Sequence, residues 1–308
     1  TYDGNGHVIK NLKVSAKFIH SGLFGVIGSR GVIKNLGLEN CDIESYDDAG
    51  TIAGAGMDVG SNVGTILNCY ATGTVKGSEA GGLVGTGFKK IINCYTVCNV
   101  ESIDTDKGHA SGIAAIPAGR IEIKNCVALG QKLTGGQLDQ VGSPRTTRIL
   151  FYTSDDITDN NYAYAQMKVN GSEIPTSSDF YGHNKDHGAN ISYSSGKGLD
   201  KQFSEIFKDI GGEKASDIWN FEDNMLPTLK NENVSTAKPL PSYMRSGSTT
   251  ADFSGKGTQA SPYLIQNRDD LIKLRDRVKD GKGYAENYFK QTTDIDLDGI
   301  EWIPIGTD

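Results

Sequence analysis

Short apolar runs alternate with glycine and asparagine over the first 130 residues of the chain, and two phrases return along this stretch. One is Ile-x-Asn followed by Leu or Cys, and the other is a variant of Gly-Leu-Val-Gly. The central apolar residues of the second phrase, Leu23, Ile52, Leu83 and Ile113, lie 29, 31 and 30 residues apart. A repeat near thirty residues indicates a solenoid, because one such unit cannot bury its apolar face without stacked neighbours.

The repeats predict strands rather than helices. Each contains runs of four to six residues rich in β-branched side chains and broken by Gly, Asn and Asp, whereas a helical repeat needs longer amphipathic runs. Two or three short strands per turn, each in register with its equivalent about 4.8 Å away, form a parallel β-helix. We therefore predict an all-β solenoid of about five to six coils over residues 1–165, with small α-helical caps.

The asparagine of the first phrase is expected at a bend between two strands. Asn tolerates left-handed backbone angles, and stacked Asn side chains can hydrogen-bond from coil to coil. The residue after each bend should point into the core, where cysteine acts as a small apolar side chain. The predicted asparagine ladder is Asn11, Asn35, Asn68, Asn93 and Asn125, and the predicted core column beside it is Leu12, Leu36, Cys69, Cys94 and Cys126.

Three of the five cysteines therefore fall in the core column. No pair has the spacing of a zinc site or of a redox motif, so we expect free buried thiols rather than disulfides. The pattern does not assign the state of Cys41 or Cys98, although Cys98 lies close to Cys94 in the sequence.

Beyond residue 165 the pattern changes. A Gly-, Ser- and Asp-rich stretch up to about residue 198 reads as an excursion loop. Apolar residues then recur at i, i+3, i+4 and i+7 from Phe203 to Ile210, which predicts a helix ended by Gly211 and Gly212. Residues 166–230 are predicted to form this loop and a C-terminal cap, because the last coil of a solenoid otherwise exposes core side chains and a strand edge.

Residues 231–252, rich in Ser, Thr and Pro, read as a linker. Residues 253–308 predict a further strand–helix–strand unit, with strands at Pro262–Ile265 and Tyr288–Leu297. Asn267 is placed to N-cap the helix between them, which carries Leu271, Leu274 and Val278 on one face. A single amphipathic helix between strands suits the cap that a β-helix needs at its start.

Composition agrees with a secreted solenoid. Gly reaches 39 of 308 residues, as tight corners require. The net charge of −7 without a basic run argues against nucleic acid or an anionic membrane surface as a partner. No apolar stretch is long enough to cross a bilayer, and there is no signal peptide. Thr1 indicates a piece processed or excised from a longer chain, so the missing signal does not bear on export.

The phrases at Gly22–Gly25 and Gly82–Gly85, together with Ile-x-Asn-Cys, resemble the GLUG-motif repeats of bacterial surface and adhesin-like proteins. The resemblance covers about residues 1–130 and 253–308. It implies a right-handed parallel β-helix at the cell surface or outside the cell, and it marks architecture strongly and activity hardly at all. In that family a cassette resembling residues 255–306 comes first, whereas here it follows the coils.

Three arrangements follow from this order. Residues 253–308 can complete the first coil of their own chain, complete that of the next molecule, or begin a second cassette. We expect them to complete a first coil, with the next molecule slightly favoured because a Pro-containing linker reaches outward. Pairing between molecules would join unlike ends and generate a filament.

Candidate metal ligands are few. Asp294, Asp296 and Asp298 resemble the start of a calcium loop, but Ile305 stands where its bidentate Glu is expected, so an edge strand is favoured. His183 and His187 would need a helix to converge on a metal, and a solvated loop is favoured for them. We predict no metal and no cofactor.

Candidate catalytic residues are equally few. Asp155, Asp156 and Asp159 could line an acidic groove, but the carboxylates of β-helix glycan enzymes come from equivalent positions on adjacent coils, and no Asp recurs in that way here. We predict no catalytic residue and no enzymatic activity.

Tyr70 and Tyr95 follow ladder cysteines and should stack outward on successive coils about 5 Å apart. Such a row can hold a sugar ring or a partner's aromatic side chain, although a place beneath a loop is favoured over an exposed binding face. We predict a structural or adhesive surface protein that self-associates, with a glycan-binding module or a carbohydrate-active enzyme as alternatives. An exposed aromatic row would favour the module, and in-register carboxylates beside a deep groove would favour the enzyme.

Overall fold

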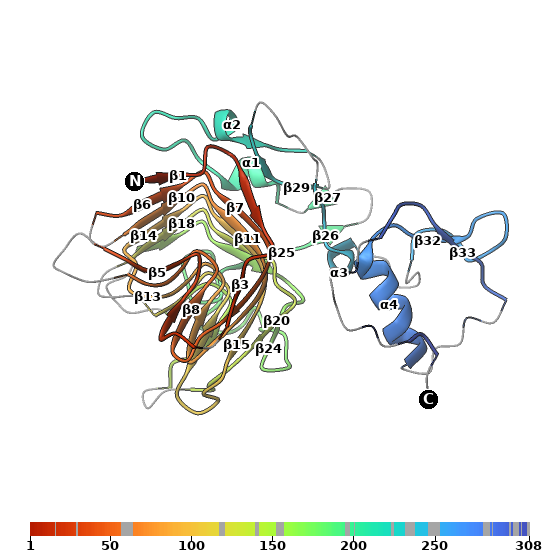
Figure 1. The fold of residues 1–308 in the computed structure, drawn as a ribbon, viewed down its shortest axis with the longest axis horizontal. Helices are drawn as coiled ribbons and strands as arrows, with labels where there is room; N and C mark the ends of the chain where they lie inside the picture. The colour runs from red at the N-terminus through yellow and green to blue at the C-terminus, as the bar shows by residue number, and fades with distance from the viewer. Residues whose placement is uncertain are drawn as a thin grey trace. The chain divides into compact units, whose positions relative to one another are not determined.

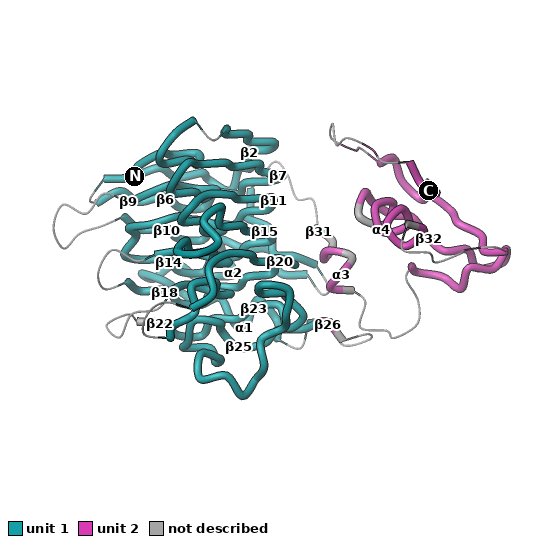
Figure 2. The backbone as a smooth tube through the Cα atoms, turned by 90° about the horizontal axis from the view of Figure 1, so that it is seen from below, with its two compact units in different colours: residues 1–192, 199–238 teal, residues 193–198, 239–308 magenta. Residues whose placement is uncertain are grey.

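The computed structural model describes residues 1–15, 17–28, 30–56, 64–116, 121–138, 142–151, 157–194, 198–199, 201–222, 225–231, 238–245, 253–279, 284, 286–295, 297, 302 and 304–306. The chain divides into two compact units (Figure 2). Unit 1 comprises residues 1–192 and 199–238, and unit 2 comprises residues 193–198 and 239–308.

The stack in unit 1 consists of four parallel sheets, which the chain visits in the order A, B, C and D before it returns to sheet A 25 to 35 residues later. Sheet A contains β1 (Tyr2–Asp3), β6 (Val32–Lys34), β10 (Thr65–Leu67), β14 (Lys90–Ile92), β18 (Glu122–Lys124) and β22 (Ile157–Asp159). Sheet B contains β2 (Val8–Lys10), β7 (Gly37–Glu44), β11 (Tyr70–Gly77), β15 (Tyr95–Ser102), β19 (Val127–Ala128), β23 (Tyr162–Tyr164) and β25 (Ala189–Ile191), with β3 (Lys13–Val14), β20 (Lys132–Thr134) and β24 (Lys168–Val169) beside this path.

The two remaining sheets follow the same progression. Sheet C contains β4 (His20–Ser21), β8 (Asp48–Gly50), β12 (Glu79–Gly81), β16 (His109–Ser111) and β21 (Thr146–Thr147). Sheet D contains β5 (Phe24–Ile27), β9 (Ala53–Gly56), β13 (Val84–Thr86) and β17 (Ala114–Ile116). Figure 1 shows β6, β10, β14 and β18 side by side, as stacked turns require.

Equivalent residues of successive turns pair in register and bury equivalent side chains. Thr65 pairs with Val32 in the turn before it and with Lys90 in the turn after it. The residues that point inward from sheet A, Ile33, Ile66, Ile91 and Ile123, are at most 2% exposed, and burying each contributes about 1.5–3 kcal/mol. The predicted all-β, solenoid-like fold of parallel strands in stacked sheets with few helices is confirmed.

Asparagines form the corner between sheets A and B. Asn35, Asn68, Asn93 and Asn125 have φ angles of 51–55°. In the last three, Nδ2 donates to the Oδ1 of the asparagine one turn earlier, at 3.3 Å from Asn68, 3.3 Å from Asn93 and 3.0 Å from Asn125. Asn160 extends the ladder by one rung of 2.8 Å. The core column behind it, at most 1% exposed, consists of Leu36, Cys69, Cys94, Cys126 and Asn161.

Asn11 and Leu12 do not belong to these columns, so the prediction is wrong for both. β2 pairs with β7 in sheet B, and Asn11 therefore lies beside Asn40, whose Nδ2 donates to Asn11 Oδ1 at 2.8 Å. The ladder ends at Asp3, which pairs with Lys34 in register and accepts from Asn35 Nδ2 at 3.1 Å. The phrase at residues 9–12 begins within a strand of sheet B, whereas the other copies begin within strands of sheet A. The sequence of the phrase is the same in both places, so it does not reveal the sheet.

The last turn is covered by residues 170–191, here called the end loop. The backbone N–H of Ile149 donates to Asp186 O at 2.9 Å, and that of Asn161 donates to His183 O at 2.9 Å. Part of the predicted excursion loop therefore closes this end of the stack, and strand pairing in sheet B continues beyond residue 165 to β25.

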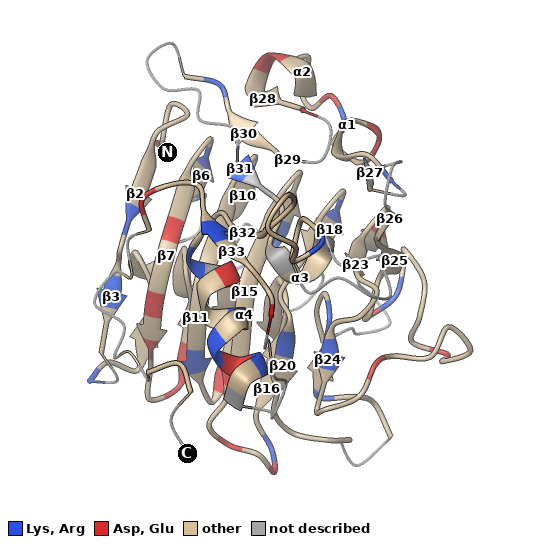
Figure 3. Cartoon of the chain, turned by 90° about the vertical axis from the view of Figure 1, so that its right-hand side faces the viewer, with Lys and Arg blue, Asp and Glu red and all other residues tan. Residues whose placement is uncertain are grey.

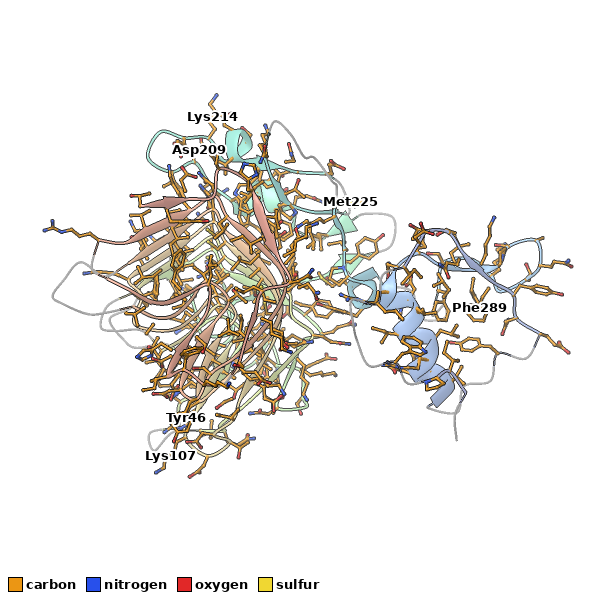
Figure 4. The ribbon with its side chains drawn as sticks, in the orientation of Figure 1. Tyr46, Lys107, Asp209, Lys214, Met225 and Phe289 are labelled. Carbon is orange, nitrogen blue, oxygen red and sulfur yellow. The ribbon has the colours of Figure 1, made fainter. Side chains whose placement is uncertain are left out.

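The segment predicted to cap the last turn lies along the side of the stack instead. Residues 201–231, here called the strap, follow the corner between sheets A and B, where Asn93 Nδ2 donates to Lys208 O at 2.7 Å and Tyr95 OH to Pro227 O at 2.8 Å. The strap contains α1 (Phe203–Ile206), α2 (Ala215–Ile218), β28 (Trp219–Asn220), β29 (Met225–Leu226) and β30 (Thr228–Leu229). Figure 4 shows Asp209 and Lys214 of the strap on the side of the coils opposite Tyr46 and Lys107.

The predicted helix up to Ile210 ends after four residues as α1. Phe207 already has an extended backbone, with φ −72° and ψ 133°. Ladder side chains bind the backbone here, because Asn160 Nδ2 donates to Ile206 O and Lys208 N donates to Asn93 Oδ1. These bonds replace those that a longer helix would make.

At the opposite end of the stack, β1, β2, β4 and β5 are the outermost strands of their sheets, and no strand among the described residues pairs with their outer edges. Four apolar side chains of this first turn are 40–58% exposed, namely Tyr2, Phe18, Ile19 and Val26. Leu23 is half-buried, whereas the equivalent Ile52 and Leu83 in the next turns are fully buried.

Unit 2 contains β32 (Tyr263–Ile265), α4 (Arg268–Lys279) and β33 (Phe289–Gln291), with the two strands parallel. Asn267 caps α4, since its Oδ1 accepts from Asp270 N at 2.9 Å. The second strand ends at Gln291 rather than at the predicted Leu297. The predicted linker contains β31 (Lys238–Pro239) and α3 (Ser242–Arg245), and β26 (Tyr193–Ser194) and β27 (Gly198–Leu199) precede the strap.

Candidate functional site

Tyr70 and Tyr95 stack on successive turns of sheet B, with ring centroids 5.0 Å apart and planes at 3°. They are 1% and 0% exposed because the strap covers them with Trp219 and Phe203, at centroid distances of 5.9 Å and 5.5 Å from Tyr95. Burial raises the pKa of the Tyr95 hydroxyl well above its usual value. The two rings therefore lie beneath another segment, and an exposed aromatic binding face is not formed.

A pocket of about 250 Å³ lies beside Tyr70, within unit 1. Its walls come from the first three turns of sheet B, from β30 and the nearby Asn231, and from Lys238 of β31. The lining residues are Gly6, His7, Val8, Lys10, Glu39, Tyr70, Thr228, Leu229, Asn231 and Lys238. Sequence reasoning missed this pocket, since Lys238 is about 170 residues from Tyr70 in the chain and no pattern links the two.

Opposite charges meet in this pocket. The Lys238 ammonium contacts Glu39 Oε1 and the Tyr70 hydroxyl, and it lies 4.2 Å from the Tyr70 ring centroid. The Tyr70 hydroxyl also donates to Glu39 Oε1 at 2.7 Å, and Lys10 Nζ is 3.6 Å from Glu39 Oε2. Burial, followed by repulsion from Lys10, lowers the pKa of Lys238 to about 7. Figure 3 shows the same alternation along the sheet, with basic positions on β2 and β3 beside acidic ones on β7.

A second group of polar side chains forms a column across sheet C, here called the charge column: His20, Asp48, Glu79, His109 and Arg145. Its first four members pair in register from turn to turn. His20 Nδ1 lies 2.6 Å from Asp48 Oδ2, His109 Nδ1 lies 2.8 Å from Glu79 Oε2, and Arg145 Nη1 lies 3.2 Å from His109 Nε2.

The charge column was not predicted, although its spacing is visible in the sequence. Asp48, Glu79 and His109 each stand four residues before the central apolar residue of a Gly-Leu-Val-Gly phrase. Asp48 and Glu79 are carboxylates in register on adjacent turns, the arrangement that would favour a glycan enzyme, but each one already contacts a histidine. Burial raises the pKa of Asp48 despite hydrogen bonds from Thr86 and His20.

His183 and His187 do not converge. His187 is 3% exposed, and its Nδ1 accepts from the backbone N–H of Arg148 at 3.2 Å. Burial, together with repulsion from Arg148, lowers the pKa of His187 to about 3, so its ring is neutral. His183 lies at the surface, 3.5 Å from Asp159. A solvated position is therefore correct for His183 and wrong for His187.

The remaining candidates are less informative. Asp155, Asp156, Asp296 and Asp298 lie outside the described residues, and Asp294 is exposed. Within the part of the chain that the structure describes, no group of three or more His, Cys, Asp or Glu side chains could hold a metal ion. In the same part, no helix has the length and apolar character needed to cross a membrane.

All five cysteines are free and buried. Burial raises the pKa of Cys94 well above its usual value, with further contributions from Cys126 and Cys69, and it raises the pKa of Cys41 to about 12. Cys41 and Cys98 lie on either side of Gly73 in sheet B. The thiols of Cys41 and Cys94 are therefore poor nucleophiles in the folded protein.

No protein-family model matches the chain. A stretch of 87 residues, 28% of the chain, is 44% identical to halomucin of Haloquadratum walsbyi, and the chain covers about 1% of that protein. A crystal structure described as a "putative immunoglobulin A1 protease" of Bacteroides ovatus resembles this fold with a TM-score of 0.51 and 26% sequence identity, over 75% of this chain and 77% of that one. Membership of the GLUG-motif family stays a prediction.

Proposed function

We propose that this chain is a structural and adhesive protein of the cell surface or the extracellular space. A right-handed parallel β-helix of about five to six coils, built from GLUG-type repeats, serves as its rigid spacer. The similarities to halomucin and to a protein named for an antibody substrate support a location outside cells, since mucins and antibodies occur there.

The unequal ends of the stack carry the proposal. The end loop closes the last turn, whereas no strand among the described residues pairs with the outer edges of the first turn, where Phe18 and Ile19 are each 58% exposed. An open edge with exposed apolar groups is a template for further strands. Residues 253–308 supply a strand–helix–strand unit that completes this first turn, in the next molecule or in the same one. Completion in the next molecule joins unlike ends into a filament.

The test is deletion of residues 253–308. Light scattering should then lose the self-association of the intact protein, while far-UV circular dichroism keeps the signal of the strands. Phe18→Ser with Ile19→Ser should give the same loss. The matched control is Ile103→Ser, because Ile103 is 52% exposed just after β15, three turns of the stack away from β2. An intact protein that is a monodisperse monomer at high concentration contradicts assembly between molecules and leaves completion within one chain.

We also propose that the chain is not an enzyme. The in-register carboxylates of Asp48 and Glu79 lie 2.6 and 2.8 Å from His20 and His109, and we infer that these contacts hold the turns together rather than serve a reaction. The measurement is incubation with immunoglobulin A1 and with a panel of polysaccharides. Cleavage by the wild type that Glu79→Gln abolishes would overturn this part of the proposal.

A further inference from the structure

We infer that the pocket beside Tyr70 binds a sugar residue that carries a carboxylate group, of the hexuronate class. The pocket lies in unit 1, on the outer face of sheet B, and its function does not depend on how residues 253–308 assemble. The inference therefore goes beyond a spacer role and makes one face of the spacer a specific ligand site.

The size of the pocket limits the occupant to about one ring. Its volume of about 250 Å³ falls below the ~300–1,000 Å³ typical of sites for drug-sized molecules. A single pyranose unit fits this space, and its neighbours in a chain would extend outward past the exposed Lys10, whose side chain is 65% exposed.

The charges select a carboxylate. Two lysines, Lys10 and Lys238, face a single carboxylate, Glu39, so the pocket holds one excess positive charge when both are protonated. Glu39 is committed to the Tyr70 hydroxyl and to Lys238 through Oε1. Lys10 is the more weakly held ammonium, at 3.6 Å from Glu39, and can pair with an incoming anion by a charge-assisted hydrogen bond.

The other side chains that line the pocket favour a sugar over a small inorganic anion. Glu39 Oε2 can accept from hydroxyl groups, and Thr228 and Asn231 also line the pocket, with the Asn231 amide 2.9 Å from His7 Nδ1. Val8 and Leu229 supply the apolar surface that the C–H face of a ring requires. Glu39 repels a small inorganic anion as it repels a carboxylate, but the inorganic anion leaves this apolar surface uncovered, so we expect it to bind less tightly.

The site should take up a proton when it binds its ligand. The groups that face Lys238 are Glu39, the Tyr70 hydroxyl and Lys10, with His7 further along the wall. Because the pKa of Lys238 is about 7, part of its population is neutral near that pH. A bound carboxylate favours the charged form, so affinity should fall as the pH rises above about 7.

The experiment is a calorimetric titration of the full chain with glucuronate, glucose and sulfate as separate probes. We expect glucuronate to bind most tightly, and Lys10→Met to weaken it by about tenfold or more. Lys10 is exposed, so this variant should fold normally. Lys107→Met is the matched control, because Lys107 lies at a distant corner of the coils (Figure 4) and should leave the affinity unchanged.

Lys238→Met should weaken binding at neutral pH and remove the loss of affinity above pH 7. Equal affinity for glucose overturns the role of the carboxylate, and equal affinity for sulfate overturns the assignment to a sugar. An absence of binding by all three probes overturns the site itself. None of these outcomes depends on the light-scattering result, so failure of the site and failure of the assembly are distinguishable.

Discussion

Two columns of polar side chains run along the stack. Both connect successive turns by polar contacts between side chains, but they use different residues to do so. The asparagine ladder at the corner of sheets A and B joins four asparagines and Asn160 by bonds of 2.8–3.3 Å. The charge column on sheet C uses different residues at successive turns. An amide is both donor and acceptor, so an asparagine ladder can continue through any number of turns.

A column of charges cannot continue in this way. A carboxylate only accepts, and like charges directly opposite each other are destabilising. Asp48 and Glu79 meet in the centre of the column, and each turns to a histidine on its far side, His20 and His109. The column is therefore two pairs placed back to back, with Arg145 added at one end. The charge column therefore cannot be extended by repeating one residue type, whereas the asparagine ladder gains one rung with every added turn that carries an asparagine.

The largest effect is expected from breaking the ladder at its centre. Asn93 is 1% exposed, and its side chain bonds Asn68, Asn125 and both backbone groups of Lys208. Asn93→Ala should lower the free energy of unfolding by about 2–4 kcal/mol, because it leaves buried partners unsatisfied and places alanine at positive φ. Urea unfolding followed by circular dichroism measures this loss.

Two variants separate the causes of that loss. Asn93→Gly removes the bonds without the backbone strain and should be less damaging than Asn93→Ala by about 1 kcal/mol. Asn11→Ala is the matched control, since Asn11 has a φ of 60° but is exposed and shares one bond with Asn40. An effect of Asn11→Ala as large as that of Asn93→Ala would show that the ladder bonds are not what stabilises the corner.

The difference between the columns also explains what the sequence reveals. Identical residues at identical positions are recognisable as a repeat, so Asn35, Asn68, Asn93 and Asn125 predict the corner and, with it, the stacked parallel sheets. Complementary residues serve the stack equally well but change from turn to turn, so Glu79 and His109 are not recognisable by matching phrases. The phrase at Asn11 shows the opposite error, because an identical motif can lie in another sheet.

The next effect in size comes from the charge column. The Glu79 carboxylate accepts from the ring and from the backbone N–H of His109, at 2.8 and 3.1 Å. Glu79→Ala should therefore cost about 1–3 kcal/mol in free energy of unfolding. Glu79→Gln keeps the shape and an acceptor and should cost less. Equal losses for the two variants would mean that packing, not the polar contact, accounts for the effect.

A smaller effect distinguishes the columns by their response to pH. Burial raises the pKa of Asp48 above 3.8, in spite of Thr86 and His20, while the neighbouring Asp47 adds to the rise. The folded state then holds the Asp48 proton more tightly than the unfolded state does, so this group stabilises the fold at low pH. That contribution is lost as the pH rises from 3.8 through the folded-state pKa.

Asp48→Asn should abolish this loss, so the variant gains stability relative to the wild type as the pH rises through that window. Asn93→Ala should show a difference from the wild type that does not vary over the same range. Urea titrations of both variants at a series of pH values make the comparison. A difference for Asp48→Asn that is flat, or that changes in the opposite direction, contradicts the assignment.

Aromatic contacts show the other limit of sequence reasoning. The repeat alone predicts Tyr70 and Tyr95 on successive turns, and their ring centroids lie 5.0 Å apart. Their cover, Trp219, comes from more than 120 residues later in the chain and follows no period. Local pattern predicts the stack, but non-local packing decides whether a side chain on it is a surface or a core residue. The pocket beside Lys238 cannot be predicted for the same reason, because its lining residues come from distant parts of the sequence.

The smallest effect is expected on the reactivity of the core column behind the ladder, which is shielded from reagents in solution. Cys69, Cys94 and Cys126 are fully buried, and their thiols contact backbone carbonyls of sheet A. Because a thiol reacts as the thiolate and burial raises the pKa of Cys94, titration of the native protein with a thiol reagent should show fewer than three fast-reacting groups. All five should react once the protein is unfolded in urea.

Asn93→Ala loosens the corner in front of this column and should speed the reaction, whereas Asn11→Ala should not. Three or more fast-reacting thiols in the wild type would mean that the column is not a closed core behind the ladder.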